Sequence, residues 1–368
     1  MLGSRHGGIG RYSLELSKHL LALDRRNLYC LFINPASADK SDVDLLSKYS
    51  NTKIIASNIR HYSIKEQSRF YKQLNMENLD LVHFPNFNVP LLYKKPFVVT
   101  IHDMVHHKIS GHKKSHFLQF LAYKKIIQDA SVKARAIITV SNHSKKEIHK
   151  YLNAPLEKIY VIYEGSNLNC KISENAVASV KEKFFLQFPY FLFVGVLERK
   201  KNLPNLTRGF DLFLEKNKFK MDLVIVGKAD KHYPEIRHKA MDIKHNNRLI
   251  FTDFVEDPDL SALYKGAFAF VSASLHEGFG LPGIEAMKFN LPLVVSNTEV
   301  FNEIYDNAAI YFNPLDPNDI SEKMKLLAAD SQFYQKQRAN SAARADFFDW
   351  NNTAQETLLI YNSIINSS

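Results

Sequence analysis

Two glutamates separated by a glycine-rich turn are the side chains of this chain best suited to ligand chemistry. Glu277 begins the string EGFGLPGIE and Glu285 ends it, eight residues later. Gly278 and Gly280 allow backbone amides to approach a ligand closely. The helix expected near Pro282 favours anionic or polar groups at its start. Taken alone, Glu277 would be explained as a solvated side chain and Glu285 as a residue that complements the helix dipole. The complete string favours two carboxylates that accept hydrogen bonds from two sets of hydroxyls.

Two further places carry candidate functional groups. The run Arg199-Lys200-Lys201 follows an apolar stretch and precedes Asn202. Such a run is often a solvated turn, but it can also bind phosphate. His102 ends another apolar stretch, where an open α/β sheet presents its ligand-facing groups. A lone histidine is more often a packing or surface residue. For Asp103 we favour a structural role as a cap of the next segment.

Apolar runs that alternate with amphipathic stretches predict the elements that position these groups. Their continuous apolar character indicates strands buried on both faces, hence parallel sheets covered by helices. A polar stretch near 165–185 separates two series, which predicts an α/β fold with two doubly wound domains and a ligand cleft. The first series is 28–34, 80–84, 97–102, 136–140 and 159–163, and the second is 190–195, 222–227, 248–252, 267–272 and 291–296.

Local signals also predict where several helices begin. Asp257 and Asp316 each precede a proline, as a cap does at a helix start. Ser144 with Glu147 fits a capping box. Near the start of the sequence, GGIGRYSLEL (7–16) reads as a glycine loop that leads into a helix.

Composition narrows the class of protein. At 368 residues the chain is long for one core, so two domains are expected. The net charge of +10 is spread along the chain without a basic-aromatic signature, which makes nucleic-acid binding the weaker interpretation. Two cysteines form no disulfide framework, and no apolar run reaches the length of a membrane span. The pair Asp42/Asp44 is expected in a polar loop and the pair Asp257/Asp259 at a helix start, so neither indicates a metal site. The histidines of 102–108 make no convincing zinc site either.

The string from Glu277 to Glu285 resembles the E-x(7)-E signature of the retaining family-four glycosyltransferases. The resemblance extends along most of the chain. The other matching segments are GGIGRYSLEL (7–16), TIHDM (100–104), TVSNHSKKEI (139–148), VGVLERKKNLPNL (194–206) and FFDWNNTAQETLLIY (347–361).

This resemblance implies the GT-B fold, in which two Rossmann-like domains face each other across a cleft. Residues 1–168 would form the acceptor-binding domain, and 169–349 would bind the nucleotide sugar. A helix at about 350–368 would cross back to the first domain. The family implies no metal and no cofactor, because helix dipoles and cations neutralise the leaving diphosphate.

The resemblance also assigns roles to single residues. Glu285 would bind the ribose hydroxyls, Glu277 the donor sugar, and Lys201 the diphosphate. Whether Arg199 or Lys200 supplies a second cation stays open, because the family usually has Pro-Arg-Lys at this place. His102 would reach the donor sugar. The implied catalytic residues are His102, Lys201 and Glu277, and the implied donor-binding residues are Gly8, Gly10, Arg199, Lys200, Lys201, Glu277, Gly278, Phe279, Gly280, Leu281 and Glu285.

The implied activity is retaining transfer of a hexose from a nucleotide-diphosphate sugar to a glycan or polyprenyl-linked acceptor. GDP-mannose is the first expectation for the donor and a UDP-sugar the second. Lipopolysaccharide or exopolysaccharide synthesis is the expected setting. The expected location is the cytoplasm, with a peripheral membrane contact through the basic, aromatic stretch 112–125 as the less favoured alternative to an ordinary helix. A relative without catalysis that acts as a scaffold, or a basic nucleic-acid-binding protein, are the other classes.

The opening residues carry one more expectation. In the family a strand precedes the glycine loop, whereas here Gly7, Gly8 and Gly10 follow Met1 almost at once. We expect that Met1 is an internal methionine and that about ten residues, one strand and its turn, precede it in the full protein. Without them the chain is expected to leave a gap or a substitute strand at the centre of one sheet.

Overall fold

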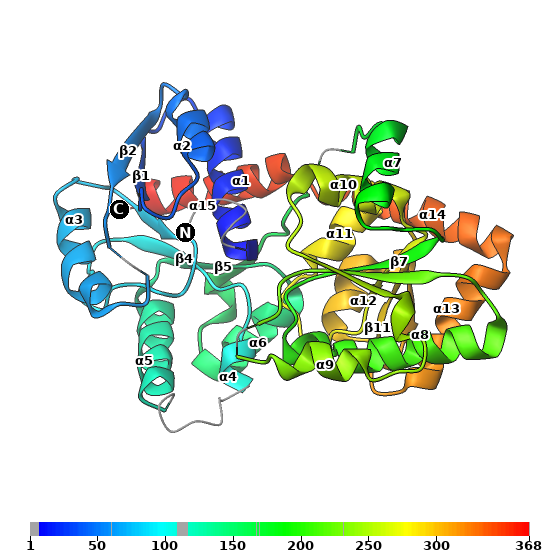
Figure 1. Cartoon of the computed structure of the whole chain (residues 1–368). Coiled ribbons are helices and arrows are strands. Elements are labelled where there is room, and N and C mark those ends of the chain that lie inside the picture. The colour runs from blue at the N-terminus through cyan, green and yellow to red at the C-terminus, as the bar shows by residue number, and fades with distance from the viewer. Residues whose placement is uncertain are drawn as a thin grey trace. The chain divides into compact units, whose positions relative to one another are not determined.

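The apolar runs form parallel sheets in two separate units (Figure 1). Unit 1 comprises Met1–Gly165 and Asp349–Ser368, and unit 2 comprises Ser166–Phe348. The computed structural model describes residues 7–59, 61–108, 117–166, 168, 170–230 and 232–367, with the backbone alone at Gly7, His106, Lys108 and 117–119. The sequence places the boundaries at 168/169 and 349/350, and the structure places them at 165/166 and 348/349.

Unit 2 contains one parallel sheet of six strands in the order β12-β11-β10-β7-β8-β9. Valine, isoleucine, leucine and phenylalanine dominate the four inner strands, which are almost entirely buried, as expected for a parallel sheet covered by helices. The strands are β7 (Tyr190–Val194), β8 (Asp222–Val226), β9 (Leu249–Asp253), β10 (Ala269–Ser272), β11 (Leu293–Ser296) and β12 (Ala309–Phe312).

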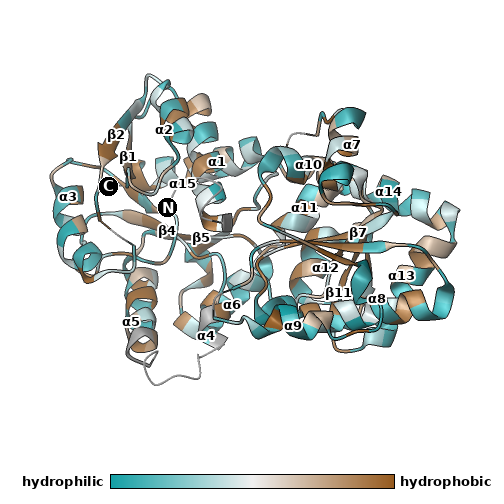
Figure 2. Ribbon diagram, viewed as in Figure 1, coloured by the Kyte–Doolittle hydropathy of each residue, from teal (hydrophilic) through white to brown (hydrophobic). Residues whose placement is uncertain are grey.

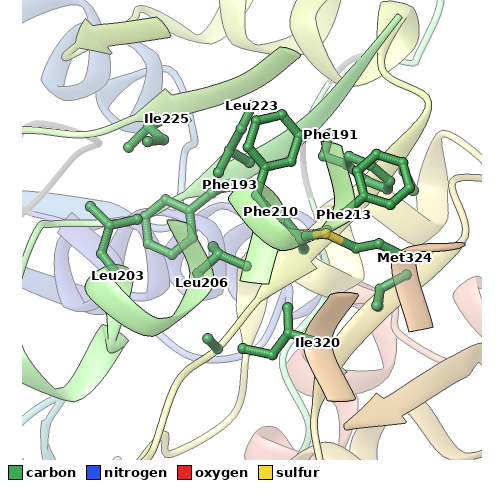
Figure 3. Close-up of a cluster of buried hydrophobic side chains, with 14 of the residues drawn as sticks. Phe191, Phe193, Leu203, Leu206, Phe210, Phe213, Leu223, Ile225, Ile320 and Met324 are labelled. Carbon is green, nitrogen blue, oxygen red and sulfur yellow. The ribbon is translucent and has the colours of Figure 1, made fainter. Parts of the chain in front are cut away.

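Aromatic and aliphatic side chains join this sheet to its helices. Phe191 and Phe193 of β7 face Phe210 and Phe213 of α8, and Ile320 of α13 completes the same cluster (Figure 3). Figure 2 shows hydrophobic residues concentrated on the strands and hydrophilic residues on the helices. The helices of unit 2 are α7 (Glu174–Lys183), α8 (Leu203–Asn217), α9 (Glu235–Met241), α10 (Asp257–Gly266), α11 (Leu281–Lys288), α12 (Glu299–Tyr305), α13 (Pro317–Ala329) and α14 (Ser331–Ala345).

The strand order of unit 2 fixes the place where a ligand can bind. β7 is the first strand of the sheet in the sequence, yet it lies in the middle and pairs with both β8 and β10. The order therefore reverses between β7 and β10. Ligands of open α/β sheets bind outside the carboxyl ends of the strands at such a switch point. The run 199–201 follows β7 and the turn 277–281 follows β10, so both lie at this point.

Unit 1 contains two parallel sheets, with the order β1-β2 in one and β3-β4-β5-β6 in the other. β1 and β3 are end strands, and both line a cavity of about 470 Å³ that α1 also borders. In the described part of unit 1, no strand joins β1 to β3. The strands are β1 (Tyr29–Ile33), β2 (Thr52–Ala56), β3 (Val82–Phe84), β4 (Phe97–Thr100), β5 (Ala136–Thr139) and β6 (Ile159–Val161).

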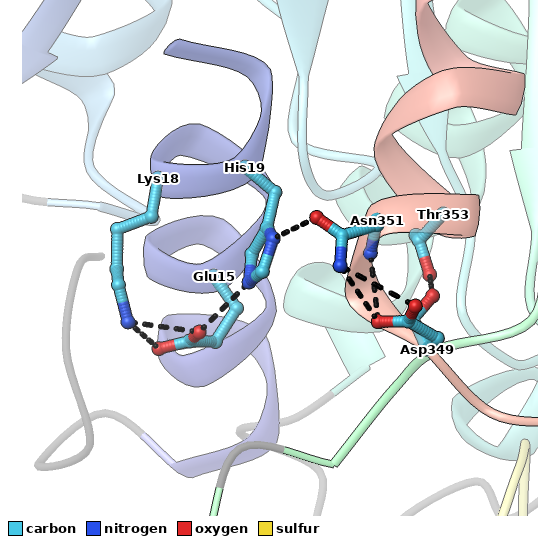
Figure 4. A network of polar contacts seen from close by, with 6 residues as sticks. All are labelled: Glu15, Lys18, His19, Asp349, Asn351 and Thr353. Atoms are coloured by element: carbon cyan, nitrogen blue, oxygen red, sulfur yellow. Dashed lines mark hydrogen bonds and ion pairs between the residues drawn. The ribbon is translucent and has the colours of Figure 1, made fainter. Parts of the chain in front are cut away.

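The last helix of the chain packs in unit 1 against the first (Figure 4). His19 of α1 contacts Asn351 of α15 through Nδ1 and Oδ1 at 3.1 Å. Tyr12 and Leu16 share a buried cluster with Trp350 and Ile360. The helices of unit 1 are α1 (Gly7–Leu23), α2 (Lys40–Ser47), α3 (Tyr71–Asn75), α4 (Val105–Lys108), α5 (Phe117–Lys133), α6 (Asn142–Leu152) and α15 (Trp350–Asn366), with a π-helical turn at Glu66–Phe70 before α3.

Each predicted strand overlaps an observed one, but the edge strands β2 and β12 are missing from the prediction. No residue of β2 is fully buried, so it lacks the apolar run of a central strand. β12 is apolar and mostly buried, a signal that the prediction did not use. The polar stretch near 165–185 contains α7, whose N-cap is Ser173. No helix among the described residues is long and apolar enough to cross a membrane.

Several predicted helix starts are wrong in detail. Asp316 is an N-cap as predicted, and its side chain accepts a hydrogen bond from the Asn318 amide at 2.9 Å. The residue before α10 is Glu256 rather than Asp257, and it makes no side-chain cap. α6 begins earlier than the capping box indicates, because Ser141 caps it by accepting from the Ser144 amide.

Two stretches predicted as loops are helical. Gly7, Gly8 and Gly10 lie in the first turns of α1, where the first amides have no intrahelical partner and glycine costs little because the end of a helix is already weakly constrained. Asp42 and Asp44 lie in α2. In both places the helix includes residues whose types are common in turns.

Candidate functional site

The turn between the two glutamates lies where sequence and topology both place it. β10 ends at Ser272, and α11 begins at Leu281 with Pro282 in its first turn, as predicted. Gly280 caps α11 with φ +99°, a left-handed conformation that strongly favours glycine. Glu285 lies within α11 and is buried, and its Oε2 accepts a hydrogen bond from the Tyr264 hydroxyl at 2.9 Å.

Glu277 forms an ion pair with Lys201, the strongest electrostatic feature of this site. Lys201 Nζ lies 2.5 Å from Glu277 Oε1, and the two side chains are 14% and 12% exposed. Burial by itself raises the pKa of Glu277. The charges of Lys201 and Lys200, with hydrogen bonds from Lys201 and Ser274, hold that pKa below its usual range. Glu277 is therefore ionised at neutral pH and fixed in place.

The three cations of the run 199–201 have different surroundings. Lys200 contributes to the low pKa of Glu277, and its carbonyl accepts from the Leu275 amide at 2.7 Å, which ties this run to the turn after β10. Arg199 pairs with Glu235 at 3.3 Å and lies over the ring of Tyr233. The geometry therefore favours Lys200 over Arg199 as the second cation near Glu277.

The remaining residues of the turn are buried or partly buried. Phe279 is buried, with its ring 5.8 Å from that of Phe348, so its side chain belongs to the core. Gly278 and Gly280 are buried, and Leu281 is partly buried at the first position of α11. Unit 2 thus brings together Lys200, Lys201 and the residues of the turn. Gly8, Gly10 and His102 belong to unit 1.

His102 is held between two acceptors in unit 1. Its Nδ1 lies 3.3 Å from Glu164 Oε1, and its Nε2 lies 3.1 Å from the Pro85 carbonyl oxygen. The ring of Tyr12 approaches edge-on with a centroid distance of 4.7 Å. Burial lowers the pKa of His102, but the hydrogen bond and charge of Glu164 outweigh it and raise that pKa above 6.5. Because both ring nitrogens face acceptors, the geometry favours the doubly protonated imidazolium.

The neighbours of His102 explain two further residues. Asp103 caps α4 by accepting from the Val105 amide at 3.0 Å, which confirms the structural role expected of it. His83 contacts the Thr100 hydroxyl at 2.7 Å through Nε2 and the Tyr361 hydroxyl through Nδ1. Burial and the nearby His102 lower the pKa of His83 to about 3, so His83 is neutral.

Sequence reasoning missed Glu164, Tyr264 and Tyr305 as residues that surround the predicted groups. Glu164 carries a usable signal, because it comes directly after the predicted strand 159–163 and carboxyl ends of parallel strands share one edge. Tyr264 and Tyr305 are helix residues without a motif. Only the tertiary structure shows that their hydroxyls contact Glu285 and Gly280.

Replacing Glu164 with glutamine is expected to lower the pKa of His102 below 6.5. Burial then acts without the carboxylate that opposes it. A raised histidine pKa adds stability that is complete below the unfolded value near 6.5 and is lost as pH rises through the folded value. In the E164Q variant this pH dependence should reverse, and stability should rise with pH, because the folded pKa then lies below the unfolded value. An NMR titration of the His102 imidazole measures the shift.

The control for this titration is Glu147→Gln, which removes the partner of His143 at 3.2 Å in the same unit. It should leave the pKa of His102 unchanged. An unchanged pKa of His102 in E164Q would show that Glu164 does not control the imidazole.

Metal ligands are not gathered in the described residues, where no group of three or more histidine, cysteine, aspartate and glutamate side chains is arranged to hold an ion. The stretch 112–125, for which we favour an ordinary helix over a membrane contact, lies partly outside the described residues. In its described part Tyr123 packs against the core of unit 1, whereas Leu121 is 46% exposed.

Two family descriptions match nearly the whole chain. "Glycosyltransferase Family 4" matches residues 6–169 and "Glycosyl transferases group 1" matches residues 176–344. The chain is 27% identical over 374 residues to O-antigen chain mannosyltransferase B of Escherichia coli, covering 96% of this chain and 95% of the relative. It is 29% identical to O-antigen chain mannosyltransferase RfbU of Salmonella typhimurium, covering 73% of this chain and 70% of that one.

Solved structures confirm the predicted fold. Anabaena HepE, solved in complex with UDP-glucose, superposes with a TM-score of 0.76 at 17% identity over 99% of this chain and 98% of its own. This fold is GT-B, with two Rossmann-like parallel-sheet domains. Together the matches make the chain a member of the family-four glycosyltransferases, a hexosyltransferase of the retaining, metal-independent kind.

Proposed function

We propose that this chain transfers mannose from GDP-mannose to a glycan or polyprenyl-linked acceptor in the synthesis of a cell-surface polysaccharide. The ion pair of Lys201 with Glu277 at the switch point of unit 2 carries the proposal. It places one fixed cation and one fixed carboxylate where a sugar diphosphate would need both. Unit 2 would bind the donor and unit 1 the acceptor.

Mannose is preferred because two relatives that match most of the chain are named as O-antigen chain mannosyltransferases. The UDP-glucose complex of HepE supports the second candidate, a UDP-sugar. Glu285 would accept hydrogen bonds from the ribose hydroxyls, a contact independent of the base. Glu277, the turn amides and Leu281 would hold the sugar.

The proposed chemical step uses the charges in unit 2. The bond between the anomeric carbon and the diphosphate oxygen breaks, and the acceptor oxygen forms its bond on the same face of the sugar. The leaving phosphate oxygen takes the acceptor proton, so that no enzyme nucleophile is needed. Lys201, with Lys200 nearby, stabilises the negative charge that develops on the diphosphate. Transfer with retention produces the glycoside and the nucleoside diphosphate.

A turnover assay with a panel of donors tests the proposal. Purified protein is incubated with GDP-mannose, UDP-glucose, UDP-galactose or UDP-N-acetylglucosamine and a polyprenyl-linked glycan, and the released nucleoside diphosphate is measured. Release of GDP and addition of one hexose to the acceptor are expected. Turnover of a UDP-sugar but not of GDP-mannose would identify the UDP-sugar as the donor. Nucleotide binding without turnover would indicate a scaffold.

The proposal includes a cytoplasmic location with a contact at the inner face of the plasma membrane. Leu121, Lys124 and Lys125 are exposed on α5, which is the arrangement of an apolar and basic contact with anionic lipid. Sedimentation with phosphatidylglycerol vesicles should be stronger than with phosphatidylcholine vesicles, and K124E/K125E should abolish the difference. Equal sedimentation with both would remove the membrane contact from the proposal.

A further inference from the structure

The side chain of Tyr305 packs directly against two glycines between Glu277 and Glu285. Tyr305 is the last residue of α12 and is 1% exposed. A Cβ atom on Gly280 would lie 2.3 Å from the Tyr305 hydroxyl oxygen, and a Cβ on Gly283 would also lie 2.3 Å from it. Both distances are too short for real atoms. The two glycines therefore provide the space that the Tyr305 phenol occupies.

The Tyr305 hydroxyl also makes a direct contact with the turn. It donates a hydrogen bond of 2.6 Å to the carbonyl oxygen of Gly280. The same carbonyl accepts from the Gly283 amide at 3.0 Å and begins the hydrogen bonding of α11. Gly280 is the residue with φ +99° at which the chain changes from turn to helix. The Tyr305 hydroxyl is therefore bonded to the residue whose backbone conformation sets the direction of the chain between Glu277 and Glu285.

The ring of Tyr305 also packs against a second aromatic side chain of α12. Phe301 lies one helical turn before Tyr305, with ring centroids 4.9 Å apart. α12 is anchored at its start, because Thr298 accepts a hydrogen bond from the Phe301 amide at 3.3 Å. Burial and the nearby carboxylate of Glu277 raise the pKa of Tyr305 well above 10, so the hydroxyl keeps its proton for donation.

We infer that Tyr305 is a positioning residue that sets the spacing of Glu277 and Glu285 through its hydrogen bond to the Gly280 carbonyl. The inference deepens the proposed function, and it rests on that function for its kinetic consequence alone. Tyr305 touches neither carboxylate through a hydrogen bond shown among the described residues. Its effect is on the backbone that presents both of them.

The substitution Tyr305→Phe removes the hydroxyl and keeps the ring. Hydrogen–deuterium exchange of peptides covering residues 277–287 should become faster in Y305F, because the Gly280 carbonyl loses one donor. The KM for the donor should rise roughly threefold to tenfold, the range expected for one lost hydrogen bond, with kcat nearly unchanged. A merely structural residue would lower stability without this separation of KM from kcat.

Tyr190→Phe is the matched control. Tyr190 is fully buried in β7 of the same unit, and its hydroxyl donates to the Leu263 carbonyl at 2.7 Å. Y190F should lower the unfolding midpoint as Y305F does, while exchange of 277–287 and the KM stay at wild-type values. Unchanged exchange in Y305F, or the same acceleration in Y190F, would overturn the inference.

A second variant tests the same contact from the side of the turn. In Gly283→Ala the new methyl group meets the Tyr305 ring, with Cζ only 2.4 Å from the ideal Cβ position. G283A should accelerate exchange of 277–287 more than Y305F, and normal exchange in G283A would also contradict the inference. Exchange needs no donor, so a wild-type protein that turns over no sugar would refute the proposed function and leave this result intact.

Discussion

Replacing Glu277 with glutamine is expected to lower kcat/KM for donor turnover by about a hundredfold or more, the scale seen when a preorganised charge is removed from an active site. Glutamine keeps the size of the side chain and loses the charge that holds Lys201 Nζ at 2.5 Å. The Lys201 ammonium is then free to leave the position in which we propose that it binds the diphosphate. Steady-state measurement of nucleoside diphosphate release gives both kinetic constants.

Glu215→Gln is the control for this loss. Glu215 also pairs with a lysine in unit 2, since Lys244 Nζ lies 3.0 Å from its Oε1, but both side chains are more than half exposed. Exposed pairs of this kind contribute about 0–1 kcal/mol. E215Q should therefore keep the wild-type kcat/KM, and a Glu277→Gln enzyme with the same kcat/KM would refute the role given to Glu277.

The candidate site was predictable where chemistry lies next to strand ends. The run 199–201 and the turn that begins at Glu277 each follow a predicted strand, which places both at one edge of a parallel sheet. The roles of Glu277, Glu285 and Lys201 were predicted only through the resemblance to the glycosyltransferase family. Tyr305 was not predictable in the same way. Its contact with Gly280 joins two segments 25 residues apart through the packing of α12 on the turn, and no local pattern records that packing.

The fold was predictable to a similar extent. The central strands of both units are short, fully buried apolar runs, which distinguishes them from their surroundings. The edge strand β2 contains no fully buried residue and lacks that signal. The glycines at 7–10 gave a misleading signal, because turn propensity is a local property while α1 is stabilised by apolar side chains such as Tyr12 and Leu16 that pack on the rest of unit 1.

Replacing Lys201 with methionine is expected to destabilise unit 2 most strongly at neutral pH. Removing one partner of a buried ion pair leaves the other charge uncompensated, at a cost of about 3 kcal/mol or roughly 6–12 °C in the unfolding midpoint. Methionine keeps the length of the side chain, so packing changes little. Lys244→Met, which breaks the exposed pair with Glu215, should shift the midpoint far less.

The pH dependence of K201M separates lost charge from lost packing. In the wild type the folded pKa of Glu277 lies below 4.5, so its stabilisation is complete above pH 4.5 and is lost as pH falls through the folded value. Without Lys201, the effect of burial dominates and the folded pKa of Glu277 rises above 4.5. Protonation of Glu277 at low pH then removes the uncompensated charge that destabilises K201M. The difference in unfolding midpoint between wild type and K201M should therefore shrink between pH 7 and pH 4. A constant difference would show that Lys201 acts through packing and that the charge of Glu277 is not what it balances.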